Sequence, residues 1–187
     1  MPRLSSEQEL IDGCLKKDRL AQRKAYEQFA PRMLSLCFRY MKDEFEAEDA
    51  MTNGFLKVFS KIDQFKSEGS FEGWVRRIMV NECLNQLRKQ RLMYADIEIE
   101  NVSNNKDFSV YESELDAEEL MHFVHQLPAG YGAVFNMYAI EGYSHKEIAE
   151  MLGINENTSK SQLSRARNFL QKLINEHDSK LNNIKHG

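Results

Sequence analysis

The residues best suited to binding a ligand lie along one side of a predicted helix in the last third of the sequence. That side carries Asn157, Lys160, Ser161, Gln162, Ser164, Arg165 and Arg167, with Thr158 beside them. Amide, hydroxyl and guanidinium donors near a helix N-terminus can reach base edges in the major groove, and Lys and Arg also bind phosphate. The pattern predicts a helix that reads duplex DNA; the alternative is a solvated polar face on a structural helix.

The flanking residues predict the turn that would present this helix. Ser144 and Glu147 have the spacing of a capping box, so a first helix should begin at His145. Gly153 can end it in the left-handed conformation, and Asn155 can cap the second helix. The inward stripe of the second helix is Ser159, Leu163, Ala166 and Leu170. This spacing predicts a helix-turn-helix, although nothing in the sequence accounts for the polar Ser159.

A second group of candidate binding residues lies on a helix expected from Phe71 to Leu92. Steps of three or four place on one face Trp74, Arg77, Asn81, Asn85 and Arg88. An aromatic ring beside cations and amides could stack on unpaired bases, read their edges and hold phosphate. A lone Trp on a helix is more often a core residue. The prediction of a single-strand binding face therefore depends on the basic neighbours of Trp74 and on the downstream helix-turn-helix.

The elements that must position these residues are helices. Apolar residues between Leu4 and Leu92 recur at three- and four-residue steps, which predicts four amphipathic helices. Residues 93–115 lose this period, and the periodic pattern returns at Ala117. The sequence therefore predicts an all-α protein: an N-terminal helical domain over residues 1–92, a flexible acidic linker over 93–115, and a C-terminal helix-turn-helix domain over 116–187.

Charge is segregated along the chain, whose formal net charge is -4. The acids between Arg91 and Glu119 are Asp96, Glu98, Glu100, Asp107, Glu112, Glu114, Asp116, Glu118 and Glu119, against the bases Arg91 and Lys106. A phosphate backbone senses only charges within a Debye length of about 8–10 Å. The net acidity therefore does not exclude DNA binding by the basic segments.

Several classes of function are disfavoured. Cys14, Cys37 and Cys83 have no C-x-x-C spacing, so no thiolate zinc site is expected, and His122 and His125 have no third metal ligand nearby. No phosphate loop or nucleophile motif is present. We therefore expect no catalytic residues, cofactor or metal. The absence of a long apolar run favours a cytoplasmic protein that is not inserted into a membrane.

The whole chain resembles an extracytoplasmic-function (ECF) sigma factor, the small two-domain kind within the sigma-70 family. Three stretches carry the resemblance: "YEQFAPRMLSLCFRYMKDEFEAEDAMTNGFLKVFSKIDQF", "SFEGWVRRIMVNECLNQLRKQ" and "LPAGYGAVFNMYAIEGYSHKEIAEMLGINENTSKSQLSRAR". It implies a transcription initiation factor that binds core RNA polymerase, directs it to promoters and helps open the minus-10 region, in answer to a stress or envelope signal. Such factors are often held inactive by an anti-sigma factor, which is then a further expected partner.

The resemblance also implies roles for particular residues. The polymerase-docking helix would present Glu48, Asp49, Asn53, Phe55 and Lys57. Single-stranded minus-10 DNA would meet Lys66, Ser67, Ser70, Phe71, Trp74, Arg77, Asn81, Asn85 and Arg88. The duplex minus-35 element would meet the residues from Asn157 to Arg167 named above.

Four positions depart from the family pattern. The family usually has Gln and an acid at Asn53 and Gly54, Val at Ser159 and Arg at Gln162. Glycine costs about 1 kcal/mol of helix propensity, so Gly54 should weaken its helix. Gln prefers adenine and Arg prefers guanine, so the minus-35 preference cannot be copied from relatives.

Two other classes of function stay open on sequence grounds. A free-standing helix-turn-helix regulator would bind a palindromic duplex tightly without polymerase. An enzyme with an appended DNA-binding domain would need a pocket of converging titratable groups, which the sequence does not offer.

Overall fold

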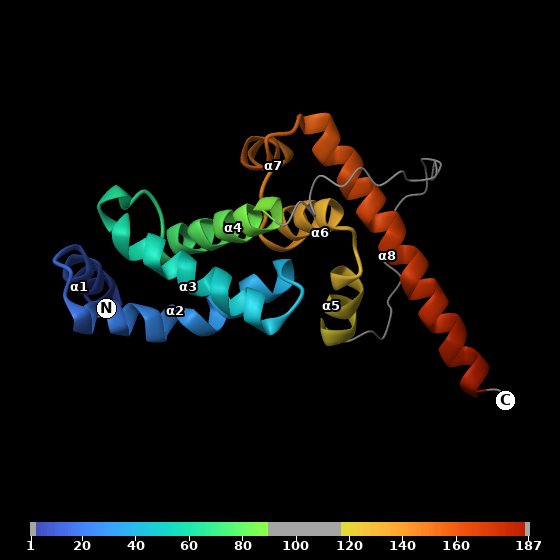
Figure 1. Cartoon of the computed structure of the whole chain (residues 1–187), viewed down its shortest axis with the longest axis horizontal. Coiled ribbons are helices and arrows are strands. Elements are labelled where there is room, and N and C mark those ends of the chain that lie inside the picture. Colours follow the sequence, from blue (N-terminus) through green and yellow to red (C-terminus); the bar gives the residue numbers. More distant parts are fainter. Residues whose placement is uncertain (1–2, 90–116, 186–187) are drawn as a thin grey trace. The chain divides into compact units, whose positions relative to one another are not determined.

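The computed structural model describes residues 3–89 and 117–185, and every regular element in those ranges is a helix (Figure 1). The chain divides into two compact units, with the division after Gln86 near the end of one long helix. The all-α prediction with two helical domains is confirmed. The predicted linker, residues 93–115, lies outside the described residues, and the exact domain boundaries stay predictions.

The first unit contains α1 (Arg3–Leu15), α2 (Arg19–Tyr40), α3 (Glu44–Ser60), a short 3-10 helix η1 (Ile62–Gln64) and α4 (Phe71–Lys89). These are the four α-helices that the periodicity predicts. Local chemistry sets the starts of α2 and α3. Asp18 accepts a hydrogen bond from Leu20 N at 2.7 Å, and Asp43 accepts one from Glu46 N at 2.8 Å.

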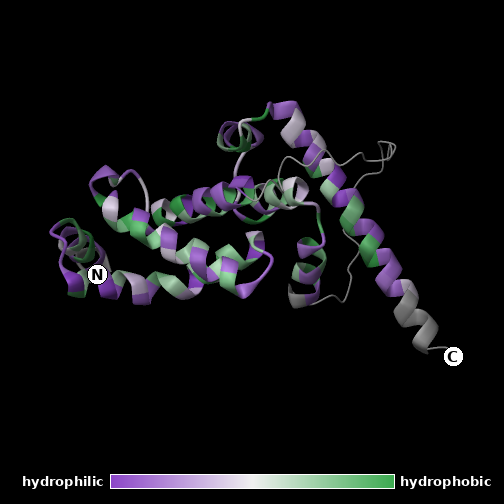
Figure 2. Cartoon of the chain, viewed as in Figure 1, coloured by the Kyte–Doolittle hydropathy of each residue, from purple (hydrophilic) through white to green (hydrophobic). Residues whose placement is uncertain are grey.

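The core of the first unit comes from the apolar stripes of its helices. Figure 2 shows the ribbons of α2, α3 and α4 alternating between hydrophobic and hydrophilic residues, as amphipathic helices do. The side chains that are almost fully buried include Met33, Leu36, Val58, Phe71, Val75 and Met79. Burial of these stripes fixes which face of each helix remains available for binding.

Three polar contacts hold α4 against its neighbours. Arg32 of α2 donates to Glu72 at 2.5 Å, and Gln86 donates to Asp49 of α3 at 2.8 Å. Lys57 of α3 forms an ion pair with Glu82, whose residue is only 4% exposed. A buried carboxylate is stable only when it is paired, so Lys57 is committed to this contact in the free protein.

The structure supplies a physical reason for the unusual Gly54. A Cβ atom built at Gly54 would lie 2.2 Å from the Sδ atom of Met79 on α4. Glycine therefore allows α3 and the Met79 side chain to approach closely. The lower helix propensity of glycine is offset by this packing.

The second unit contains α5 (Ala117–His125), α6 (Ala129–Phe135), a π-helical turn η2 (Asn136–Ile140), α7 (His145–Leu152) and α8 (Glu156–Lys185). Helix α8 is the longest element and packs against α5, α6 and α7 (Figure 1). One core cluster joins α5, α6 and α8; its buried members are Phe123, Val124, Leu127, Tyr131, Ala166 and Leu170. This core leaves the N-terminal turns of α8 with an exposed side.

Within the described ranges, no helix is both long enough and apolar enough to cross a membrane.

Candidate nucleic-acid interface

The turn between α7 and α8 has the predicted helix-turn-helix geometry. The Ser144 hydroxyl accepts a hydrogen bond from Glu147 N, and the Glu147 carboxylate accepts one from Ser144 N at 2.9 Å, which completes the capping box. Gly153 ends α7 with φ 69°, in the left-handed region. Asn155 then accepts a hydrogen bond from Thr158 N at 2.7 Å and caps α8. Local sequence chemistry thus defines both helix ends.

The first turns of α8 separate into a buried and an open side. Ser159, Leu163, Ala166 and Leu170 are buried, as predicted. On the other side the exposed residues are Asn157, Lys160, Ser161, Ser164 and Arg165, and the half-buried ones are Thr158, Gln162 and Arg167. Every residue of the predicted reading set therefore lies outside the buried stripe, on the broad accessible side of α8.

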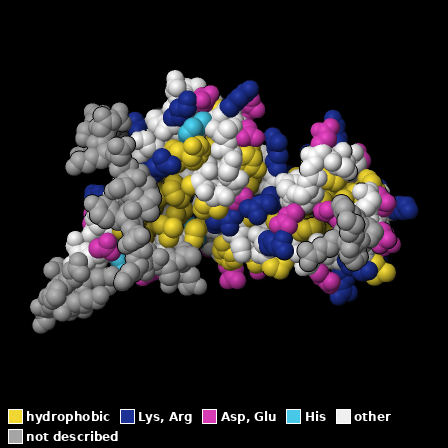
Figure 3. All heavy atoms as spheres, turned by 180° about the vertical axis from the view of Figure 1, so that it is seen from behind, with side chains coloured by type: hydrophobic (Ala, Val, Ile, Leu, Met, Phe, Trp, Pro, Cys, Tyr) yellow, Lys and Arg dark blue, Asp and Glu magenta, His cyan; other side chains and the backbone are white. Residues whose placement is uncertain are grey.

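Charge on this face is ordered before any DNA is bound. Lys160 Nζ lies 2.7 Å from the Glu156 carboxylate one turn earlier. The hydrogen bond from Lys160 lowers the pKa of Glu156 below its ordinary value. Figure 3 shows Lys and Arg side chains around the end of the second unit where α7 meets α8. Cations on an open helix face suit contact with phosphate and with guanine edges.

The structure finds a partner for Ser159 that the sequence did not reveal. The Ser159 hydroxyl lies 3.0 Å from Nδ1 of His145, the first residue of α7. The His145 ring stacks on Tyr138 of η2, with a centroid distance of 4.5 Å and an interplanar angle of 20°. The polar position in an apolar stripe was the only sequence signal of this contact.

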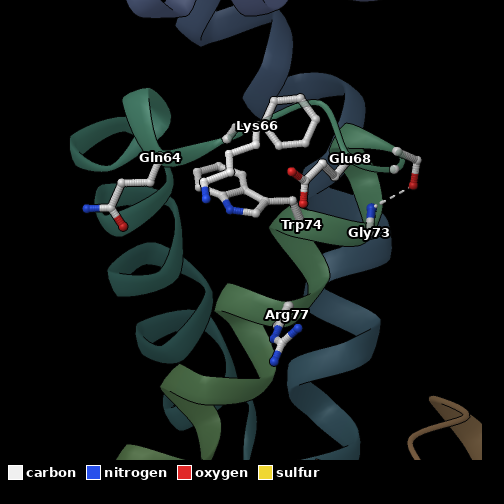
Figure 4. Close-up of a pocket in the computed structure, with 9 residues that line it drawn as sticks. Gln64, Lys66, Glu68, Gly73, Trp74 and Arg77 are labelled. Carbon is white, nitrogen blue, oxygen red and sulfur yellow. Dashed lines mark hydrogen bonds between the residues drawn. The ribbon is translucent and has the colours of Figure 1, made fainter.

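The first unit carries an open pocket of about 370 Å³. Its lining comes from η1, the following loop and the start of α4, and consists of Gln64, Phe65, Lys66, Glu68, Gly69, Ser70, Gly73, Trp74 and Arg77. In Figure 4 the Trp74 ring lies between Lys66 and Glu68, and Arg77 lies one turn further along α4. The Ser70 hydroxyl accepts a hydrogen bond from Gly73 N at 3.0 Å and helps begin α4.

The ring of Trp74 rests on other aromatic rings. It stacks on Phe71 with a centroid distance of 5.8 Å and an angle of 21°, and it contacts Phe65 at 5.5 Å. Phe71 is only 1% exposed in the free chain, and its contact with DNA stays a prediction. Phe71 is the first residue of α4 on its inward side, so it supports Trp74 from the core.

The other predicted minus-10 residues differ in exposure and in their distance along the chain from the pocket. The Asn81 amide donates to the Arg77 carbonyl at 2.9 Å; both side chains are exposed, Arg77 in the pocket lining and Asn81 one turn beyond it. Asn85 and Arg88 are half-buried further along α4 and do not line the pocket. Ser67 is exposed in the loop with φ 56°, an uncommon conformation for a residue other than glycine.

The predicted polymerase-docking residues do not all lie on the surface. Phe55 is only 3% exposed and packs on Tyr26 at a centroid distance of 4.8 Å. Glu48 and Asp49 are exposed, whereas Asn53 and Lys57 are half-buried. The docking role of these five residues stays a prediction, and Phe55 lies on the inward side of α3 in the free chain.

The exposed apolar residues of α3 were not predicted. Phe45 is 80% exposed and Leu56 is 63% exposed. Steps of four, three and four residues place Phe45, Asp49, Thr52 and Leu56 on one side of the helix. We call these four residues the outer face of α3. Two large apolar side chains exposed on the same side of one helix make this face a candidate protein-binding surface.

Comparison with known proteins gives the family. Residues 25–92 match sigma-70 region 2, and residues 117–170 match sigma-70 region 4. The chain is 28% identical over 158 residues to the ECF RNA polymerase sigma factor SigE of Mycolicibacterium smegmatis, covering 81% of this chain but 61% of that protein. It is 26% identical over 181 residues to the ECF sigma-E factor of Haemophilus influenzae, covering 90% and 95% of the two chains.

A solved structure has a similar fold. The sigma factor RpoE of Bartonella quintana, crystallised with the anti-sigma factor NepR, is 26% identical and has a TM-score of 0.55, covering 82% of this chain and 96% of that one. Both sigma-70 regions, in the expected order, together with these relatives show that the chain belongs to the ECF group of the sigma-70 family, whose members are transcription initiation factors.

Proposed function

We propose that this chain is an alternative sigma factor that binds core RNA polymerase, directs it to promoters and helps open the minus-10 region. One observation carries the proposal. The second unit presents a donor-rich helix suited to duplex DNA, and the first unit has an open aromatic pocket suited to an unpaired base. A simple duplex-binding regulator needs the first feature but has no use for the second.

The duplex-reading role belongs to the first turns of α8. Lys160, Gln162 and Arg165 can present charged and amide donors to base edges, and Asn157 and Ser161 can bind phosphate or water. Gln162 has both a donor and an acceptor and suits adenine. The minus-35 sequence of this factor should therefore contain an adenine that a relative with arginine there does not select.

The strand-opening role belongs to the Trp74 pocket. A base turned out of the duplex could stack on Trp74, while Lys66 and Arg77 hold the adjoining phosphates. Stacking of a base on an aromatic ring contributes about 1–3 kcal/mol, which is similar to the few kcal/mol needed to unpair one base. Phe71 beneath Trp74 keeps the ring in place before DNA arrives.

The polymerase-docking role can also include the outer face of α3, to which the predicted docking residue Asp49 belongs. Phe45 and Leu56 supply exposed apolar area, and Asp49 lies between them with its carboxylate already bonded to Gln86. Burial of two large apolar side chains, each worth about 1.5–3 kcal/mol, would anchor a partner helix. Glu48 would then lie at the edge of the contact.

The remaining partners follow from the same role. We propose that an anti-sigma factor can hold the chain inactive, supported by the relative of known structure that was crystallised with one. A cytoplasmic location is proposed because promoter DNA and polymerase are there. RNA synthesis itself belongs to the polymerase, and this chain contributes binding energy and strand opening. A stress or envelope signal is proposed as the trigger.

Reconstitution with core polymerase tests the function. We expect the full chain to co-elute with core polymerase and to start transcription at a defined set of genomic promoters. Phe45→Ala with Leu56→Ala should weaken co-elution, whereas Leu20→Ala, which removes an apolar side chain 70% exposed on α2, should not. Tight binding to a palindromic duplex without any polymerase-dependent transcription would instead establish a helix-turn-helix regulator.

A further inference from the structure

The buried hydroxyl of Ser159 interrupts an otherwise apolar stripe. The residue is 0% exposed, and its stripe neighbours Leu163 and Ala166 are also buried. A buried hydroxyl destabilises the fold unless it is hydrogen-bonded. Among the described residues, the side-chain partner of Ser159 is Nδ1 of His145, at 3.0 Å. A polar group is therefore kept in the core by one specific contact.

The imidazole of His145 is held from its other side as well. It stacks almost parallel on Tyr138, and the Arg167 guanidinium lies 5.9 Å from the centre of the Tyr138 ring. Tyr138 comes from the π-helical turn η2, which therefore presents a ring to the start of α7. Three elements, η2, α7 and α8, meet at this one histidine.

The contact lies beside the residues that read DNA. His145 is the first residue of α7, and Ser159 is in the first turn of α8, next to Lys160 in sequence. A hydrogen bond here ties the two helices of the helix-turn-helix at the end that enters the groove. It can fix the rotation of the first turn of α8 more tightly than an apolar contact, because hydrogen bonds require a defined direction.

The surrounding charges favour a neutral imidazole. Burial lowers the pKa of His145, and Lys160 lowers it further, while Glu156 raises it and Arg167 lowers it. These three charged groups are on α8; η2 contributes Tyr138, and the capping box of Ser144 and Glu147 lies on the His145 side. With its proton on Nε2 the neutral ring accepts the Ser159 hydroxyl proton at Nδ1, and with a proton on Nδ1 it donates to the hydroxyl oxygen instead.

We propose that His145 and Ser159 form a positioning pair that sets how the first turn of α8 reads the minus-35 element. The pair itself touches no base. It acts by holding Lys160 and Gln162 in register with the groove, so its loss should reduce sequence preference more than general DNA affinity. This inference rests on the proposed function, because a reading register matters only if the helix reads duplex DNA.

A matched pair of substitutions at Ser159 tests the inference. Thr and Val add the same volume, but only Thr keeps the hydroxyl. Holoenzyme formed from core polymerase and the full chain would be used to select binding sites from a random duplex library, and each variant would be compared on the selected site and on a scrambled duplex. For Ser159→Val we expect the ratio of specific to non-specific affinity to fall about fivefold or more, the lower end of one base contact. Ser159→Thr should retain most of that ratio.

A second arm changes the other member of the pair. His145→Phe keeps a ring to stack on Tyr138 but removes the nitrogen acceptor. We expect His145→Phe to lower the ratio of specific to non-specific affinity about as much as Ser159→Val does. The double variant should lower this ratio no further than either single variant, because all three lack the same hydrogen bond. Thermal unfolding of each variant, followed by circular dichroism, identifies any loss that comes from misfolding.

A pH profile separates positioning from simple packing. As the pH falls through the pKa of His145, the ring gains a proton and a positive charge. The hydrogen bond can survive this change by reversing, with Nδ1 donating to the Ser159 hydroxyl. Wild-type sequence preference should therefore persist through the step, while binding to the scrambled duplex should strengthen slightly. Ser159→Val should show low preference at every pH. Nitrogen NMR of the free chain should show a different Nδ1 resonance in Ser159→Val and in the wild type.

The outcomes distinguish this inference from the proposed function. If wild-type holoenzyme selects a site and folded Ser159→Val prefers it as strongly as Ser159→Thr does, the positioning role is overturned and the function stands. If wild-type holoenzyme selects no duplex sequence, the proposed function itself is overturned. An Nδ1 resonance that is the same in the wild type and in folded Ser159→Val would contradict the pairing directly, whatever the DNA measurements show.

Discussion

Individual residues of the reading helix differ in how they are held before DNA binds. Lys160 is in an ion pair with Glu156, and Arg167 lies over the ring of Tyr138. Arg165 is exposed, two turns inside α8. If Lys160 contacts DNA as proposed, it must exchange the carboxylate for a base or phosphate, whereas Arg165 extends from an exposed part of the helix.

Replacement of Arg165 distinguishes base reading from phosphate binding. If its guanidinium contacts a base edge, Arg165→Ala should cost about 1–3 kcal/mol on the selected promoter and relax preference at one position. Binding of holoenzyme to sites varied at single bases measures this. Lys172→Ala, an exposed cation more than a turn further along α8, is the matched control and should change little. An equal loss on every sequence would show that Arg165 contacts only phosphate.

Replacement of Trp74 tests the pocket as a site for an unpaired base. We expect Trp74→Ala to spare binding of holoenzyme to duplex promoter and to impair strand opening, measured by the reactivity of unpaired thymines to permanganate. Trp74→Phe should retain part of the opening, because an aromatic face remains. Since Trp74 stacks on Phe71, the thermal stability of each variant must be compared. Normal opening by folded Trp74→Ala would remove the single-strand role of the pocket.

At the scale of elements, the close approach of α3 and α4 depends on a residue that looks unfavourable for a helix. Gly54 on α3 leaves space for the Met79 side chain of α4, which is 0% exposed. The same two helices carry the outer face of α3 and the Trp74 pocket. A change in the spacing of α3 and α4 should therefore affect both proposed binding surfaces of the first unit.

A double-mutant cycle measures this packing. Alone, Gly54→Ala should destabilise the chain by about 1–3 kcal/mol, the usual cost of overpacking, despite a gain of about 1 kcal/mol in helix propensity. In a Met79→Ala background the space is free, so Gly54→Ala should become neutral or stabilising. Denaturant unfolding of the four proteins gives the coupling. A stabilising effect of Gly54→Ala in the wild-type background would show that Met79 moves aside at little cost.

At the scale of the whole molecule, the charge pattern explains how an acidic chain can bind DNA. The formal net charge is -4, yet the candidate interfaces on α4 and α8 carry Arg77, Lys160 and Arg165 on exposed positions. At low salt, where the Debye length rises to about 30 Å at 0.01 M, the acids between Asp96 and Glu119 can oppose phosphate over a longer range. They should therefore limit unspecific binding by the free factor.

Neutralising these acids tests their effect on unspecific binding. Changing Asp96, Glu98, Glu100, Asp107, Glu112 and Glu114 to the corresponding amides should strengthen binding of the free chain to a scrambled duplex at low salt. The gain should disappear as added salt shortens the Debye length, which titrations at increasing ionic strength would show. An unchanged affinity at low salt would contradict the proposed repulsion.

Helix ends and buried helix stripes could be predicted from the sequence, because they depend on residues that are close together along the chain. Helix starts depend on side chains within three residues of the terminus, so the capping box at Ser144 and the cap at Asn155 were predictable. Helical periodicity likewise predicted the buried stripe of α8 and the open reading face opposite it. Family resemblance carried the functional expectation, because its three motifs occur in the right order.

The tertiary structure decided which side chains can be reached and which are held by distant partners. Periodicity specifies residues that share a helix face, but only packing against other helices shows which face is inward. For that reason Phe55 and Phe71 were assigned to binding surfaces and lie in the core. Contacts between separate elements, such as Gly54 with Met79 and Ser159 with His145, depend on how helices approach one another, which no local pattern records.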